Sequence, residues 1–194
     1  MAGIILGVVG RQRSGKTLIA YKICKYISKT YHVPVYSNIM SPKDGFIWTN
    51  SLENFPLDLS PKVLFIDEVY NGTDAQDFKK LKEISIFLNT LGKQNCLFIY
   101  TTIGAEMVYN RLRNQTTVGI SVNSDSNFIY YRWVNFAKSS LSEFKVPKNE
   151  ALFNDVYYDT SFIPLDFDWS MDSWRDKLKK FYLANYHLDV SKFI

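Results

Sequence analysis

The most informative part of this sequence is a run of eight residues near its N-terminus: Gly10-Arg11-Gln12-Arg13-Ser14-Gly15-Lys16-Thr17. The run fits the P-loop pattern G-x-x-x-x-G-K-[ST]. It follows the apolar segment 4–9, which predicts a buried strand, and opens an amphipathic helix that is predicted to begin at Gly15 and to be ended by Pro34. In this context glycines let backbone N–H groups curl around phosphates at the positive end of the helix. A Gly-rich turn with a solvent-exposed lysine is the alternative, and it leaves the flanking strand and helix unexplained.

The pattern assigns a task to individual residues of the loop. We expect all eight residues to surround the phosphates of ATP, with Lys16 in contact with the β- and γ-phosphates. The Thr17 hydroxyl would hold Mg²⁺. Lys16 is therefore expected to act both in binding and in catalysis.

Two acidic residues, Asp67 and Glu68, end the apolar run 62–66, which predicts a second buried strand. An Asp-Glu pair at this place is the Walker B pattern. Asp67 would orient Mg²⁺ through its water shell, and Glu68 would act as the general base that polarises the attacking water. The second carboxylate favours hydrolysis over phosphate transfer to a small substrate. The alternatives are that Asp67 caps a turn and that Glu68 is a surface carboxylate or ion-pair partner.

A third apolar run predicts a buried strand over 96–101, and two hydroxyl residues, Thr101 and Thr102, stand at its end. In folds of this class the strand beside Walker B often ends in a polar residue that senses the γ-phosphate. We expect Thr102, ahead of Thr101, to have this part. Threonine is also simply a good strand residue, so a purely structural role is equally open.

The rest of the chain predicts an α/β fold, namely a P-loop NTPase three-layer sandwich with a mainly parallel central sheet. Further predicted elements are a short strand at 35–37, a helix starting at Asp74, a short helix at 107–112, an antiparallel edge hairpin at 116–122 and 128–136, and a C-terminal helix from Met171. We expect a single ATPase domain over 1–194, with a core at about 4–138 and a C-terminal extension at about 139–194.

Composition sets further limits. The chain has 194 residues, of which 46% are hydrophobic and 22% charged, with two cysteines and a formal net charge of +4. Two distant cysteines argue against a disulfide framework or a four-cysteine zinc site and favour a reducing, intracellular location. No apolar run is long enough for a transmembrane helix, and the N-terminus lacks the pattern of a signal peptide. Lys22, Lys25 and Lys29 are spaced for one solvated side of the first helix.

The motifs together resemble those of the FtsK/HerA branch of P-loop ATPases. The likeness covers about residues 4–122 and includes the segment Tyr109-Asn110-Arg111-Leu112-Arg113 after the third strand. Within the branch, the chain is most similar to small viral genome-packaging ATPases and to the Zot-like proteins of filamentous phages. It departs from the branch at Ile103, where glutamine is usual.

This resemblance implies a Mg²⁺-dependent ATP hydrolase that forms a hexameric or pentameric ring. Such a ring translocates double-stranded viral DNA into a preformed capsid, with a capsid or portal-vertex protein as a further partner. The resemblance implies a location in the host cell cytoplasm, and it is also compatible with association with the virion. Arg113 or Arg111 would complete the active site of the neighbouring subunit, although either could also be a surface or DNA-facing arginine.

Two other functions fit part of the pattern. A type II thymidine kinase has a similar length, a GKT loop and an Asp-Glu pair, but normally carries a four-cysteine zinc site. A nucleotide-gated assembly module with slow turnover would need Lys16 and Thr17 but would tolerate loss of Glu68.

Overall fold

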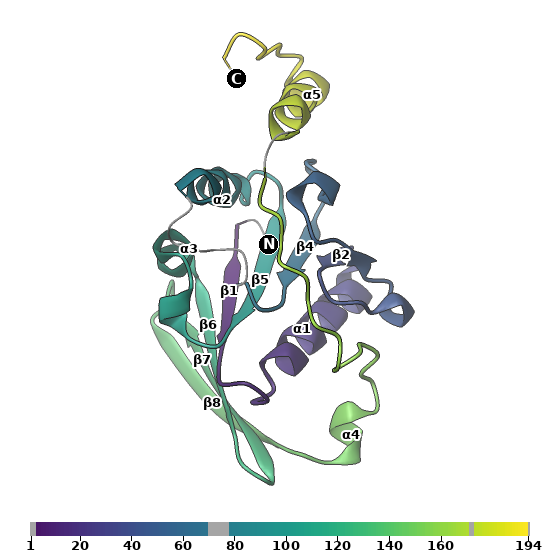
Figure 1. The fold of residues 1–194 in the computed structure, drawn as a ribbon, viewed down its shortest axis with the longest axis vertical. Helices are drawn as coiled ribbons and strands as arrows, with labels where there is room; N and C mark the ends of the chain where they lie inside the picture. The colour runs from purple at the N-terminus through teal and green to yellow at the C-terminus, as the bar shows by residue number, and fades with distance from the viewer. Residues whose placement is uncertain (1–2, 70–77, 171–172, 194) are drawn as a thin grey trace.

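An eight-stranded mixed sheet runs through the computed structural model, which describes residues 3–69, 78–170 and 173–193 (Figure 1). The strand order is β3-β2-β4-β5-β1-β6-β7-β8. The strands are β1 (Ile5–Val9), β2 (Val35–Ser37), β3 (Ile47–Trp48), β4 (Lys62–Ile66), β5 (Cys96–Thr102), β6 (Val118–Ser124), β7 (Phe128–Asn135) and β8 (Ser140–Pro147). The helices are α1 (Lys16–Tyr31), α2 (Phe78–Thr90), α3 (Asn110–Gln115), α4 (Glu150–Phe153) and α5 (Trp174–Tyr186), with short 3-10 helices η1 (Pro42–Asp44), η2 (Leu52–Asn54) and η3 (Ala105–Met107).

Parallel pairing joins six of these strands, from β3 through β1 to β6, as the sequence predicted. Strand β5 lies between β1 and β4 and pairs with both. Because the strands are parallel, their carboxyl ends meet at one edge of the sheet. The phosphate loop follows β1, the acid pair follows β4 and the two threonines end β5, so the topology gathers all three at this edge.

The antiparallel part of the sheet is larger than the sequence indicated. The predicted hairpin forms as β6 and β7, but β8 then pairs with β7 in register from Phe128↔Pro147 to Asn135↔Ser140. Almost every residue of β8 is exposed, and the strand carries Glu143, Lys145 and Pro147. Edge strands of this kind lack the apolar alternation that marks a half-buried strand, so the sequence pattern does not reveal them.

Helix α1 covers one face of the sheet (Figure 1), burying Ala20, Cys24 and Ile27 against side chains of β1, β4 and β5. The predicted apolar stripe is thus confirmed at these positions, whereas Tyr31 is exposed. The expectation of a solvated lysine face is wrong for Lys25, which is buried. Its ammonium group reaches an aspartate and a backbone carbonyl, and these contacts offset the loss of water.

The opposite face is covered by α2 and α3, and by residues near the C-terminus. Phe87 of α2 packs edge-to-face against Phe98 of β5 and against Trp169 and Trp174. The C-terminal helix forms as α5 from Trp174, while Met171 and the predicted helix start at Asp74 lie outside the described residues. Among the described residues, no helix combines the length and the apolar character needed to cross a membrane.

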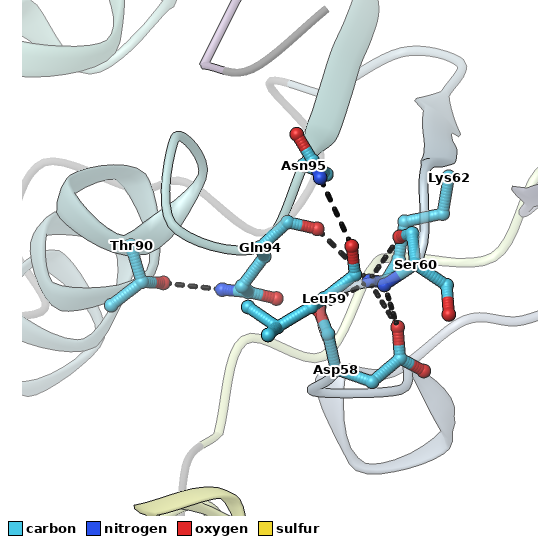
Figure 2. Close-up of polar contacts among 7 residues, drawn as sticks. All are labelled: Asp58, Leu59, Ser60, Lys62, Thr90, Gln94 and Asn95. Atoms are coloured by element: carbon cyan, nitrogen blue, oxygen red, sulfur yellow. Dashed lines mark hydrogen bonds and ion pairs between the residues drawn. The ribbon is translucent and has the colours of Figure 1, made fainter. Parts of the chain in front are cut away.

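A buried lysine fixes the start of strand β4. Figure 2 shows the Lys62 ammonium group among oxygen atoms of three residues: the Asp58 carbonyl and carboxylate at 2.8 Å each, the Ser60 carbonyl at 2.9 Å and the Gln94 carbonyl at 3.0 Å. The side chain is almost fully buried. These contacts tie the turn before β4 to the turn before β5, at the edge of the sheet opposite the acid pair.

The change Lys62→Met keeps the aliphatic stem but removes the donor, so the buried carbonyl groups lose their partner. We expect the free energy of unfolding in urea to fall by roughly 2–4 kcal/mol. Lys93→Met, at an exposed position in the turn between α2 and β5, is the matched control and should change it by less than about 0.5 kcal/mol. Equal losses in the two variants would show that the Lys62 contacts do not stabilise the fold.

Candidate nucleotide-binding site

The phosphate loop has a backbone that demands glycine at two positions. Gly15 has a φ of +99°, and a Cβ there would lie 3.0 Å from Ile129 Cδ1. A Cβ at Gly10 would lie 2.5 Å from the Val122 carbonyl oxygen and 2.7 Å from Ser14 Oγ. A side chain at either position would therefore strain the loop or displace strand β6 or β7. These two constraints explain the glycines of the motif from the packing of this chain alone.

The residues that open α1 face the acid pair at the end of β4. Thr17 Oγ1 lies 2.9 Å from Asp67 Oδ1 and 3.2 Å from Oδ2, and donates its hydrogen to this carboxylate. Lys16 is buried at the same place, and its positive charge favours the ionised form of Asp67. The two sequence motifs, fifty residues apart, are thus in direct contact.

Hydrogen bonds fix both the backbone and the side chain of Asp67. Its N–H donates to Asn38 Oδ1 (2.8 Å), and its carbonyl accepts from Asn38 Nδ2 (3.0 Å). Thr101 Oγ1 donates to its carboxylate at 2.6 Å. Burial raises the pKa of Asp67, as does the charge of Glu68, while the hydrogen bonds from Thr101 and Thr17 act in the opposite direction. The carboxylate is therefore rigidly placed but incompletely compensated, which favours a cation beside it.

Glu68 adopts a backbone conformation that is rare for this residue type, with a φ of +55°. Its N–H donates to Thr101 Oγ1 at 2.9 Å, so one threonine hydroxyl fixes both members of the acid pair. The side chain is half-buried and lines the same pocket as Lys16 and Asp67. Strain at a residue that faces a pocket is characteristic of functional sites.

A pocket of about 670 Å³ lies in front of these groups. Seven of the residues expected at the site line it, namely Gln12, Arg13, Gly15, Lys16, Thr17, Asp67 and Glu68. The remaining three loop residues, Gly10, Arg11 and Ser14, are not among the described residues that line it. Ser14 Oγ is buried without a hydrogen-bond partner among the described residues, so it is free to bond a ligand or a water.

Three other expected residues lie elsewhere. The Thr102 hydroxyl is buried and donates to the Gly104 carbonyl at 2.9 Å, so the structure brings Thr101, rather than Thr102, to the acid pair. Arg111 and Arg113 are exposed on α3, where they donate to Asn89 Oδ1 (3.3 Å) and Asn110 Oδ1 (2.7 Å). Within the described part of the chain, neither arginine lines the pocket.

Two further parts of the chain, which the sequence motifs did not indicate, contribute to this site. Asn38 follows the predicted short strand 35–37, and a polar residue directly after a strand next to β4 is a signal that could have identified it. The other contributor is the segment 158–164, which lines the same pocket as the phosphate loop. Its sequence has no motif, so only the tertiary structure reveals it.

The residues present fit a magnesium ion. Thr17 and Asp67 offer only oxygen atoms, which Mg²⁺ prefers, and they already touch each other. Among the described residues, no three His, Cys, Asp or Glu side chains gather into a metal cage. Mg²⁺ in nucleotide sites needs no such cage, because phosphates and waters complete its coordination.

Comparisons with known proteins place this fold. No protein-family model matches the chain, and no curated protein sequence matches it. Among solved structures, the N-terminal domain of zonular occludens toxin from Neisseria meningitidis has a TM-score of 0.55 at 15% identity, over 82% of this chain and 100% of that domain. The genome-packaging NTPase B204 of Sulfolobus turreted icosahedral virus 2, in complex with ATPγS, has a TM-score of 0.54 at 11% identity, over 73% of this chain and 96% of that one.

A third similar structure is the flagellar accessory protein FlaH from Methanocaldococcus jannaschii, with a TM-score of 0.55 at 9% identity, over 84% of this chain and 91% of that one. At these identities the likeness establishes a common fold. The chain therefore has the P-loop NTPase α/β fold, and the predicted structural relationship to viral packaging ATPases and Zot proteins is confirmed at this level.

Asn38→Ala tests whether the Asn38 side chain stabilises the backbone of Asp67, while the acid pair itself is left unchanged. The variant leaves the buried N–H and carbonyl of Asp67 without partners, so we expect the free energy of unfolding to fall by roughly 2–4 kcal/mol. Asn114→Ala, at an exposed position on α3, should leave it within about 0.5 kcal/mol of the parent chain. Urea unfolding measures both, and a small loss in Asn38→Ala would contradict the bonding described for Asp67.

Proposed function

We propose that this protein is a viral genome-packaging ATPase that hydrolyses ATP to move double-stranded DNA into a preformed capsid. The observation that carries the ATPase part is the shared carboxylate of Asp67, contacted by the hydroxyls of Thr17 and Thr101 in the pocket lined by Lys16 and Glu68. The packaging part is supported by the fold, which is similar to a genome-packaging NTPase crystallised with ATPγS.

The residues of the site divide the reaction among them. Lys16 and the loop N–H groups would bind the β- and γ-phosphates of ATP, with Gly10, Arg11 and Ser14 supporting the loop. Thr17 and Asp67 would hold Mg²⁺, which when bound neutralises phosphate charge. Glu68 would accept a proton from water while the water oxygen bonds to the γ-phosphorus and the bond to the β-phosphate oxygen breaks. Thr101 would keep Asp67 and Glu68 in place, with Thr102 behind it at the strand end.

Assembly into a ring is part of the proposal. Arg113 and Arg111 are exposed at the surface, away from the pocket of their own chain, and a guanidinium at the surface can reach the pocket of a neighbouring copy. We propose a hexamer or pentamer of this kind that acts on double-stranded DNA together with a capsid or portal-vertex protein. Residues 1–194 would act as one ATPase domain in the host cytoplasm, and this role is compatible with association with the virion.

Glu68→Gln tests hydrolysis. The variant keeps the size of the side chain but cannot accept a proton, so we expect turnover of ATP to fall by about 100-fold or more, while ATP affinity stays within about 3-fold. Turnover of the parent chain should rise with linear double-stranded DNA, and that rise should vanish in the variant. Glu53→Gln, at an exposed position in η2, is the control.

Each outcome of this assay selects a function. Thymidine phosphorylation by the parent chain would favour the type II thymidine kinase-like alternative. Negligible turnover in the parent chain, with assembly that depends on nucleotide, would favour the nucleotide-gated module. Unchanged turnover in Glu68→Gln would remove Glu68 from the mechanism.

Arg113→Ala tests the contribution of a neighbouring subunit. We expect loss of turnover with ATP binding retained, since the pocket of the same chain is untouched. Lys16→Ala should lose ATP binding yet retain its arginines. Co-assembly of the two variants should restore part of the turnover, because Arg113→Ala supplies intact pockets and Lys16→Ala supplies intact arginines. The same experiment with Arg111→Ala identifies the arginine that acts, and no recovery with either would contradict a site shared between subunits.

A further inference from the structure

The pocket has two chemically different halves. One half is formed by the phosphate loop and the acid pair, and it is charged. The other half comes largely from residues 153–164, which we call the strap. It presents the apolar side chains of Phe153, Phe162, Ile163 and Pro164 beside the polar residues Tyr158, Asp159, Thr160 and Ser161. At about 670 Å³ the pocket is in the range that holds a whole small-molecule ligand, beyond a triphosphate tail alone.

The strap is fastened to helix α1 directly behind the phosphate loop. The Tyr157 N–H donates to the Tyr21 hydroxyl at 3.1 Å, and that hydroxyl is also bonded to Asp44. Lys25 lies 3.2 Å from Asp44 Oδ1, donates to the Asp155 carbonyl and stands 4.4 Å above the Tyr157 ring. Because the Lys25 and Asp44 side chains are buried, this contact has a fixed geometry.

Two features turn apolar side chains of the strap toward the pocket. In α4, Leu152 is buried in the core beneath α1, whereas Phe153, which lines the pocket, is 50% exposed. Further along, the Ser161 N–H donates to Asp159 Oδ1 at 2.8 Å and the Phe162 N–H donates to the Asp159 carbonyl at 3.2 Å. This turn holds Phe162 on the pocket wall, next to Ile163, which is 82% exposed.

Apolar side chains that line the same pocket as a phosphate loop are suited to bind the apolar part of a phosphate-bearing ligand. A ligand whose phosphates lie on the loop extends into the same continuous pocket, so the part attached to the phosphates reaches the strap. Aromatic side chains bind the flat face of a nucleobase, and any base can stack on them. A phosphate-bearing ligand without a flat ring, such as inorganic tripolyphosphate, has nothing to stack on these rings.

We propose that the strap is the nucleobase-binding wall of the site, with Phe162 and Phe153 as stacking residues for the base of a nucleoside triphosphate. This inference rests on the proposed function, because it requires a triphosphate on the loop. It gives the C-terminal extension a direct role in nucleotide affinity. Tyr21 is a positioning residue, which acts through the strap.

The experiment compares two ligands, ATP and inorganic tripolyphosphate, which has the phosphate chain but no base. Calorimetry measures the affinity of the parent chain, Phe162→Ala, Phe153→Ala and the double variant for each. We expect the parent chain to bind ATP more tightly than tripolyphosphate. Each single variant should lose roughly 10-fold in affinity for ATP and less than about 2-fold for tripolyphosphate. Phe193→Ala, at an exposed phenylalanine near the C-terminus, is the matched control and should change neither.

Two further variants locate the effect. Tyr21→Phe removes the hydroxyl that holds Tyr157 and should also weaken ATP binding with tripolyphosphate binding unchanged. Lys16→Ala should weaken the binding of both ligands, because it acts on the phosphates. Near-ultraviolet circular dichroism verifies that each variant keeps its tertiary packing, and Phe162→Leu, which keeps an apolar side chain without the ring, should show an intermediate affinity for ATP.

The outcomes distinguish this inference from the proposed function. ATP and tripolyphosphate binding equally well to the parent chain, or ATP affinity unchanged in the double variant, would overturn the strap as a base-binding wall and leave the ATPase proposal intact. A parent chain that binds neither ligand would overturn the ATPase proposal, and the inference with it.

Discussion

The carboxylate of Asp67, buried at the end of β4, is the constraint on which the rest of the site depends. A buried carboxylate is costly unless donors surround it, and here Thr17 and Thr101 both supply hydroxyl groups. Asn38 fixes the backbone on either side of it. Thr17 lies in α1, Thr101 in β5 and Asn38 directly after β2, so all three elements must be in place before the site exists. The fold and the candidate chemistry are therefore coupled through one side chain.

The order of the strands explains how Thr101 can hold both residues of the acid pair. Strand β5 separates β1 from β4, and its end supplies Thr101. The Thr101 hydroxyl accepts a hydrogen bond from the Glu68 N–H and donates one to the Asp67 carboxylate. The rare backbone conformation of Glu68 is stabilised by that bond. A site of this kind is pre-organised by its own chain, while the exposed arginines of α3 leave room for a contribution from a neighbour.

The C-terminal extension is joined to the core at several separate places. Strand β8 continues the sheet, the strap is bonded to α1 through Tyr21 and Lys25, and Trp169 and Trp174 complete the apolar layer beneath α2. Lys177 of α5 also donates to the carbonyl of Leu52 in η2 at 3.1 Å and to the carbonyl of Phe55, directly after η2, at 3.0 Å. The extension therefore lines part of the candidate nucleotide pocket and also covers the second face of the sheet, so that both ends of the chain contribute to the candidate site.

The sequence by itself determined the local chemistry: the glycines and Lys16 of the loop, the acid pair, and the alternation of apolar strands and helices that predicts the parallel sheet. Such features are readable because each depends on residues close together in the chain. Tertiary structure alone decided that Thr101 rather than Thr102 meets Asp67, that Asn38 supports it, that Lys25 is buried, and that the strap faces the loop. These facts depend on contacts between residues 29 to more than 100 positions apart, which no local pattern encodes.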